Sequence, residues 1–143
     1  MNIDECTPYR ISTITAIGNL NTELFLEIIF DIFYPTDNIV YMEYGKTKNI
    51  SNFKGIHPNQ DKLKKRKNKK RFDNQSTVFI KFQDDTFVNM KIFKNGKIQM
   101  TGLKNIDNGR IAINILINYI KELYKINNNI LKDFDNLNLT NYK

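Results

Sequence analysis

Three closely spaced strand patterns constrain the fold of this chain more than any other feature. The segments are STVFIKFQ (76–83), TFVNMKIF (86–93) and KIQMTGL (97–103). Their β-branched and aromatic residues favour strands. Asp84-Asp85 and Lys94-Asn95-Gly96 separate them with residue types that form turns. The pattern predicts a three-stranded antiparallel meander over residues 76–104.

The length of the second turn decides which side chains of the meander face the core. A two-residue Asn95-Gly96 turn would pair Phe93 with Ile98 and place apolar residues on both faces. A three-residue loop, with Gly96 in the left-handed region, pairs Phe93 with Lys97. Because a slip of one residue moves every side chain to the other face, we predict the three-residue loop. The predicted core face is Val78, Ile80, Phe82, Val88, Met90, Ile92, Ile98 and Met100.

The opposite face of the meander carries aromatic rings, amides, a hydroxyl and lysines, with no acid on any of the three strands. Its residues are Phe79, Lys81, Phe87, Asn89, Lys91, Phe93, Lys97, Gln99 and Thr101. Clustered exposed aromatic side chains mark interaction sites. Three occupants are open for this face: nucleic acid, a protein partner, or a loop of the same chain.

The flanking segments predict two helices and two more strands. Strand patterns cover residues 9–19, where Thr13 and Thr15 share a face, and residues 38–44. Residues 21–34 predict a helix with Asn21 as N-cap and Pro35 after its end. A second helix is predicted over 107–125, capped by Asp107 or Asn108. Its apolar side is Ile111, Ala112, Ile113, Ile115, Leu116, Ile117, Tyr119, Ile120 and Leu123.

The formal charge of +7 comes from one strip. Residues 61–71, DKLKKRKNKKR, contain eight basic residues and one acid, and the rest of the chain carries 14 of each sign. The basic residues are Lys62, Lys64, Lys65, Arg66, Lys67, Lys69, Lys70 and Arg71. The strip is either a flexible insert or import signal, or a phosphate-contacting segment. We expect a mobile lysine-rich insertion at about 45–75 and a frayed tail at about 127–143 within a single domain of residues 1–143.

Several classes of protein are disfavoured by composition. No apolar run approaches the roughly 20 residues of a membrane span, and the polar start MNIDECTPYR is unlike a signal peptide. Cys6 has no second cysteine to pair with, which fits a reducing compartment. His57 and Cys6 are far apart without a cluster of acids, so we expect no metal, no cofactor and no catalysis. The expected location is intracellular.

The order of elements resembles one repeat of the TATA-box-binding protein family. The residues that carry the resemblance are KIFKNGKIQMTGLK (91–104) and TPYRISTITAIGNLN (7–21). The single repeat and the Asn- and Lys-rich composition are most similar to members from large DNA viruses. The resemblance implies an α+β fold with a curved antiparallel sheet of about five strands and two helices on its convex face. For a viral protein it implies the host nucleus, a viral factory or the virion.

The resemblance also implies a function and roles for individual residues. The family binds the minor groove of AT-rich duplex DNA and wedges phenylalanines between base steps. Phe93 matches a wedge residue and Thr101 a residue at the groove floor, whereas Ser76 falls near the second wedge. Thr13 and Thr15 match two further positions of the family at the groove floor. A single repeat implies a homodimer or a second such subunit.

We therefore expect a transcription initiation factor that contacts DNA, and possible contact with the transcription machinery. The expected DNA-binding residues are Thr13, Thr15, Phe79, Lys81, Asn89, Lys91, Phe93, Lys97, Gln99 and Thr101. The basic strip at 62–71 would add affinity without sequence information. The alternative is a virion or transcription-complex protein that uses the fold to bind protein or to dimerise. Single-stranded nucleic acid on the aromatic face is a third possibility.

Overall fold

A computed structural model of the chain describes residues 14–45, 53–58 and 74–143. In chain order the elements are β1 (Ile14–Asn19), α1 (Leu26–Ile32), β2 (Ile39–Tyr44), β3 (Phe53–Gly55), β4 (Gln75–Lys81), β5 (Phe87–Phe93), β6 (Lys97–Leu103), α3 (Ile106–Ile126) and the short 3₁₀ helices η2 (Asn128–Ile130) and η3 (Phe134–Asn136). Thr13 and the basic strip lie outside the described residues, so the predictions for them stay predictions.

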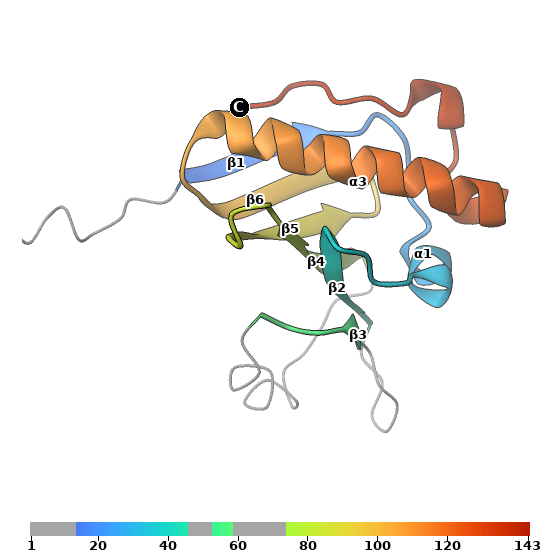
Figure 1. The fold of residues 1–143 in the computed structure, drawn as a ribbon. Coiled ribbons are helices and arrows are strands. Elements are labelled where there is room, and N and C mark those ends of the chain that lie inside the picture. The colour runs from blue at the N-terminus through green and yellow to red at the C-terminus, as the bar shows by residue number, and fades with distance from the viewer. Residues whose placement is uncertain (1–13, 46–52, 59–73) are drawn as a thin grey trace, which may run out of the picture.

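The predicted α+β class is confirmed (Figure 1). The strands form one curved antiparallel sheet in the order β1-β6-β5-β4-β2-β3. Helices α1 and α3 pack on the same side of this sheet and share its hydrophobic core. The sheet has six strands where about five were predicted, because β3 adds a short edge strand beside β2.

The predicted register of the β5–β6 hairpin is confirmed. Ile92 pairs with Ile98 and Met90 with Met100, which leaves Lys94, Asn95 and Gly96 in the loop. Gly96 has a φ of 93° and its N–H donates to the Phe93 carbonyl at 2.9 Å. The loop needs glycine here for a second reason. A Cβ at Gly96 would lie 2.5 Å from the carbonyl oxygen of Thr22.

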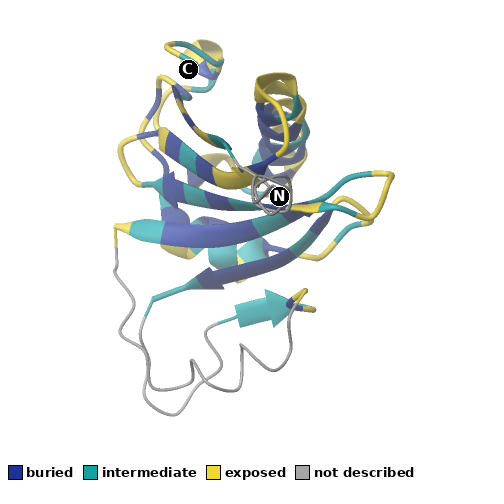
Figure 2. Ribbon diagram, turned by 90° about the vertical axis from the view of Figure 1, so that its left-hand side faces the viewer, coloured by how far each residue is buried: buried dark blue, intermediate teal, exposed yellow. Residues whose placement is uncertain are grey.

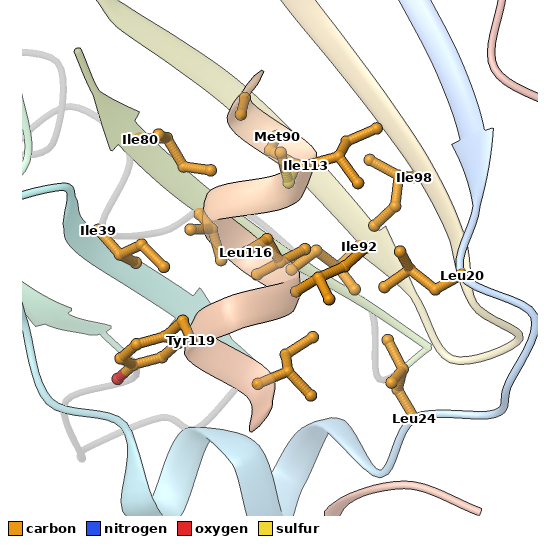
Figure 3. Close-up of a cluster of buried hydrophobic side chains, with 14 of the residues drawn as sticks. Leu20, Leu24, Ile39, Ile80, Met90, Ile92, Ile98, Ile113, Leu116 and Tyr119 are labelled. Carbon is orange, nitrogen blue, oxygen red and sulfur yellow. The ribbon is translucent and has the colours of Figure 1, made fainter. Parts of the chain in front are cut away.

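The core is built as this register requires (Figures 2 and 3). Seven of the eight predicted core-face residues are at most 3% exposed: Val78, Ile80, Val88, Met90, Ile92, Ile98 and Met100. The eighth, Phe82, lies just after β4 and is half-buried against the core. Most of the predicted stripe of α3 covers the core face, although Ile111 is 50% exposed and Ile115 is half-buried. The helix is capped by Asn105, whose Oδ1 accepts from the Asn108 N–H at 2.9 Å. The predicted caps, Asp107 and Asn108, lie inside the first turn.

The first helix is shorter than predicted. It begins at Leu26, and Asn21 is not its cap but a residue with a φ of 64°. The reason is competition for backbone groups: the Phe25 N–H, which a helix capped by Asn21 would direct to the Asn21 carbonyl, donates instead to the Ile130 carbonyl at 2.8 Å. The N–H groups of Leu20 and Leu24 donate to the carbonyls of Gly96 at 2.9 Å and Lys94 at 2.8 Å, which ties residues 20–24 to the β5–β6 loop.

Strand β3 lies in the region where the sequence predicts no regular structure. Lys54 fixes it to the helical side of the sheet by donating to the carbonyls of Phe30 at 2.5 Å and Asp31 at 2.9 Å. Its ammonium also lies 4.9 Å from the centre of the Phe30 ring. A cation at the carbonyl end of a short helix interacts favourably with the helix dipole, and the Phe30 carbonyl also accepts from the Phe33 N–H at 3.3 Å.

The last residues, for which the sequence predicts fraying, run along β1 (Figure 1). Thr140 and Asn19 exchange backbone hydrogen bonds of 2.9 and 3.0 Å, and Lys143 and Ile17 exchange bonds of 3.0 and 3.1 Å. The Tyr142 hydroxyl donates to the Ile106 carbonyl at the start of α3. Residues 138–143 therefore cover the edge of the sheet that β1 would otherwise expose.

Candidate nucleic-acid interface

The side of the sheet away from the helices, here called the outer face, collects the predicted binding residues. Within the described ranges, nine of the ten predicted DNA-contact residues lie on it, and the tenth is Thr13. Thr15, Lys97 and Thr101 are exposed, and Phe79, Lys81, Asn89, Lys91, Phe93 and Gln99 are half-buried. Their side chains share this face because β-strand residues alternate between the two sides of a sheet.

Strand pairing arranges these residues in rows across the outer face. In one row Lys91 lies between Thr77 and Gln99, and Gln99 pairs onward with Ile17. In the next row Asn89 lies between Phe79 and Thr101. Neighbours in such rows have Cβ atoms about 4.5–5.5 Å apart. The amide, hydroxyl and ammonium groups therefore form one continuous strip rather than separate sites.

The outer face is electrostatically positive. Lys81, Lys91 and Lys97 lie on its strands, although Lys81 also forms an exposed ion pair of 3.3 Å with Asp85. Among the described strand residues, Glu43 is the one acid on this side, and it is 5% exposed. The Tyr41 hydroxyl donates to Glu43 Oε1 at 2.9 Å. The carboxylate is thus buried and bonded inside the protein, whereas the lysines reach solvent.

An aromatic cluster covers the β2–β4 half of the outer face. The Tyr41 ring centroid lies 5.9 Å from that of Phe53, 4.9 Å from His57 and 5.7 Å from Phe79. His57 and Phe79 are 4.8 Å apart. Tyr41 is 0% exposed and His57 is 3% exposed. Phe79 therefore packs against a segment of its own chain, which is one of the three occupants considered for this face.

The sequence predictions did not include Tyr41, Glu43, Phe53 or His57 in the interface. The signal for the first two is the alternation in IVYMEY (39–44), which puts Tyr41 and Glu43 opposite the core residue Met42. No comparable signal marks Phe53 and His57, because their position depends on the pairing of β3 with β2. The open half of the outer face is consequently formed by β5, β6 and β1.

Hydrogen bonds of the Asp84 side chain shape the turn between β4 and β5. Asp84 Oδ1 accepts from the Thr86 hydroxyl at 2.6 Å and from its N–H at 3.2 Å. These hydrogen bonds, the hydroxyl first, lower the pKa of the Asp84 carboxyl. Asp85 follows with a φ of 66°. The two acids shape the turn, as predicted from their adjacency.

Within residues 14–45, 53–58 and 74–143, no three His, Cys, Asp or Glu side chains come together as a potential metal-binding group. Of the helices described in these ranges, none combines the length and apolar character that crossing a membrane requires.

A comparison with curated proteins finds a distant relative. Over 102 residues the chain is 31% identical to a protein of Acanthamoeba polyphaga mimivirus described as "TATA-box-binding protein-like". The match covers 68% of this chain and 27% of that protein, so the chain spans about a quarter of its relative's length. No protein-family model and no solved structure matches the chain. This partial similarity supports a relationship to TATA-box-binding-like proteins, and the fold is consistent with a single repeat of that kind.

Proposed function

We propose that this chain is a non-enzymatic, TATA-box-binding-like transcription initiation factor that binds the minor groove of AT-rich duplex DNA. The observation that carries the proposal is the asymmetry of the outer face. Its lysines are accessible, while its one described strand acid, Glu43, is buried against Tyr41. A face with amides, hydroxyls and rings beside accessible lysines matches the chemistry of a base-pair edge flanked by phosphates.

The residues have distinct roles in this proposal. Phe93 is the wedge, because it lies on the open half of the face at the end of β5. Asn89, Gln99 and Thr101 contact the groove floor, where amides and hydroxyls can pair with the acceptors of A·T pairs. Phe79 packs against Tyr41 and His57, so we give it a supporting place beside Asn89. Thr15 extends the floor on β1, and Thr13, outside the described residues, keeps its predicted role.

Lysines supply the contacts to phosphate. Lys81, Lys91 and Lys97 lie on three different elements of the outer face or its margin, so they would reach different phosphates along the duplex. The basic residues between 62 and 71 would add non-specific attraction that weakens as salt rises. Phosphate contacts orient the protein, and the floor residues read the A·T character of the groove.

Fluorescence anisotropy with an AT-rich duplex tests the proposal. Phe93→Ala and Thr101→Ala should each weaken binding, the first by about tenfold if a wedge contact of 1–3 kcal/mol is lost. Ile111→Ala and Asn114→Ala, both exposed on α3, are the matched controls and should leave affinity unchanged. If the Phe93 and Thr101 variants bind as tightly as the wild type, the outer face is not the binding site.

A protein-interaction role is the second candidate, and a specific feature favours it. A hollow of about 530 Å³ lies at the margin of the outer face, and its lining includes Ile56, 72% exposed, and Phe87, 37% exposed. Exposed apolar side chains of this size suit a protein partner, including a second copy or a related subunit. Light scattering on the wild type and on Phe87→Glu separates the two roles. Under this alternative, Phe87→Glu abolishes association without changing the affinity for DNA.

A further inference from the structure

A second hollow lies on the open half of the outer face, between Phe93 and the residues that follow η3. We call it the Phe93 hollow. It encloses about 540 Å³, and its lining includes Ile17, Phe93, Lys97, Gln99 and Asn141. Sites of about 300–1,000 Å³ are typical for small organic ligands. The hollow is therefore large enough for one nucleotide, whereas a duplex would have to lie across its mouth.

The wall formed by Asn141 is built by the pairing of residues 138–143 with β1. Hydrogen bonds between Thr140 and Asn19, and between Lys143 and Ile17, hold the chain on both sides of Asn141. Asn141 itself has a φ of 53°, a conformation that asparagine tolerates better than most residues. Its position at the rim thus depends on backbone bonds and not on the packing of its own side chain.

The side-chain amides around the hollow differ in whether they already form hydrogen bonds within the protein. Asn19 Oδ1 already accepts from the Asn21 N–H at 2.7 Å, and Asn95 Oδ1 accepts from the Lys97 N–H at 3.1 Å. No described residue forms a side-chain hydrogen bond with the amide of Gln99 or Asn141. Each of these amides can both donate and accept. The Phe93 ring and the Ile17 side chain, which is 49% exposed, also line the hollow, and Ile17 is the cross-strand neighbour of Gln99.

We propose that the Phe93 hollow binds a single unpaired nucleotide. Its base packs between Phe93 and Ile17, because every base has a π-face that stacks on an aromatic ring. The amides of Gln99 and Asn141 hydrogen-bond the edge of the base that pairing would otherwise occupy, and exposed Lys97 meets the phosphate. This inference rests on the proposed binding of nucleic acid and adds to it a subsite that shares Phe93, Lys97 and Gln99 with the duplex-binding surface. Phe93 then contacts both the base step that it wedges open and the unpaired base in the hollow.

The test compares a fully paired duplex with a duplex that differs from it by one additional, unpaired adenine. Anisotropy titrations at one salt concentration should give about tenfold tighter binding of the bulged duplex, because the unpaired base adds stacking and edge contacts. Asn141→Gly removes the amide and keeps the left-handed backbone conformation. It should abolish the preference for the bulged duplex and leave the affinity for the paired duplex unchanged. Asn114→Ala, which removes an exposed amide from α3, should keep the preference.

The outcomes separate the subsite from the proposed function. If the paired duplex binds and the bulge brings no gain, or if Asn141→Gly keeps the gain, the Phe93 hollow is not a nucleotide site. If only the bulged duplex binds, the subsite stands and minor-groove binding fails. If neither duplex binds, both proposals are overturned. A thermal melt of Asn141→Gly that matches the wild type establishes that the variant is folded.

Discussion

The phenol oxygen of Tyr119 forms two hydrogen bonds with the backbone of Tyr34. It donates to the Tyr34 carbonyl at 2.6 Å and accepts from the Tyr34 N–H at 2.9 Å. The two rings also meet edge to face, with centroids 5.4 Å apart. Tyr34 lies between the end of α1 and Pro35, so these contacts join the long helix α3 to the point where the chain turns toward β2. They hold the start of the connection to β2, which itself pairs with β4 in the sheet.

Replacing Tyr119 with Phe should destabilise the fold. The substitution keeps the ring and removes the partner of two part-buried backbone groups, which costs about 1–3 kcal/mol when such groups are left unsatisfied. Urea unfolding followed by circular dichroism measures the loss. Tyr124→Phe is the control, because Tyr124 is only half-buried and stacks on Phe134 through its ring. Equal stability of Tyr119→Phe and the wild type would contradict the role of the hydroxyl.

The same hydroxyl should make the free energy of unfolding fall as the pH rises above 10. Burial raises the pKa of Tyr119 from 10.0 to about 12. Above pH 10 the unfolded chain loses this proton while the folded chain keeps it, so the contribution of the neutral phenol is complete below pH 10 and falls between pH 10 and 12. The advantage of the wild type over Tyr119→Phe in unfolding free energy should therefore shrink above pH 10. Lysine titration is common to both proteins and cancels in the difference, so a difference that grows there would contradict the assignment.

Two glycines of the β5–β6 region should tolerate alanine differently. Gly96 and Gly102 both have positive φ, 93° and 83°. A Cβ at Gly96 would lie 2.5 Å from the Thr22 carbonyl oxygen, whereas nothing lies within 4 Å of one at Gly102. Gly102→Ala should cost roughly 1–2 kcal/mol from backbone strain alone, and Gly96→Ala should cost more. Chemical denaturation of the two variants side by side gives the order, and the reverse order would refute the close approach of residues 20–24 to the loop.

Whether Gly109→Ala stabilises or destabilises the fold should depend on the residue at position 142. In an ordinary helix this substitution stabilises by roughly 0.5–1 kcal/mol. Here the added methyl group would overlap the Tyr142 hydroxyl, so Gly109→Ala should destabilise the wild type. In a Tyr142→Ala background the same change should stabilise, which a double-mutant cycle of unfolding free energies detects. Hydrogen exchange at the Ile17 and Asn19 amides should accelerate in Gly109→Ala, because residues 138–143 detach.

Neutralising a lysine of the outer face should change the salt dependence of DNA binding. If Lys91 contacts a phosphate, Lys91→Gln should reduce the slope of log K against log salt by about 0.9. Lys121→Gln, on an exposed position of α3, removes the same charge from the opposite side and should change the slope little. Titrations at several salt concentrations provide both slopes. Identical slopes for the two variants would show that net charge, and not the outer face, drives binding.

Local rules were sufficient for much of the fold. The period of two in β4, β5 and β6, combined with the φ that only a glycine-like residue adopts at Gly96, predicted the register of the hairpin correctly. They failed for the start of α1, where Leu24 bonds to the Lys94 carbonyl. They also failed for Lys54, because nothing nearby in sequence indicates that its ammonium binds the end of α1.

For the outer face, the alternation of residues along each strand determined which side chains point away from the core. Tertiary structure alone decided which of them are accessible. Alternation places Phe79 and Phe93 on the same face without distinguishing their accessibility, but His57 packs against Phe79, and Asn141 lines a hollow beside Phe93. The physical reason is the separation in sequence between the residues that make contact. Alternation and turn geometry depend on residues within a few positions, whereas these contacts join segments far apart in the chain through backbone pairing that leaves no local signature.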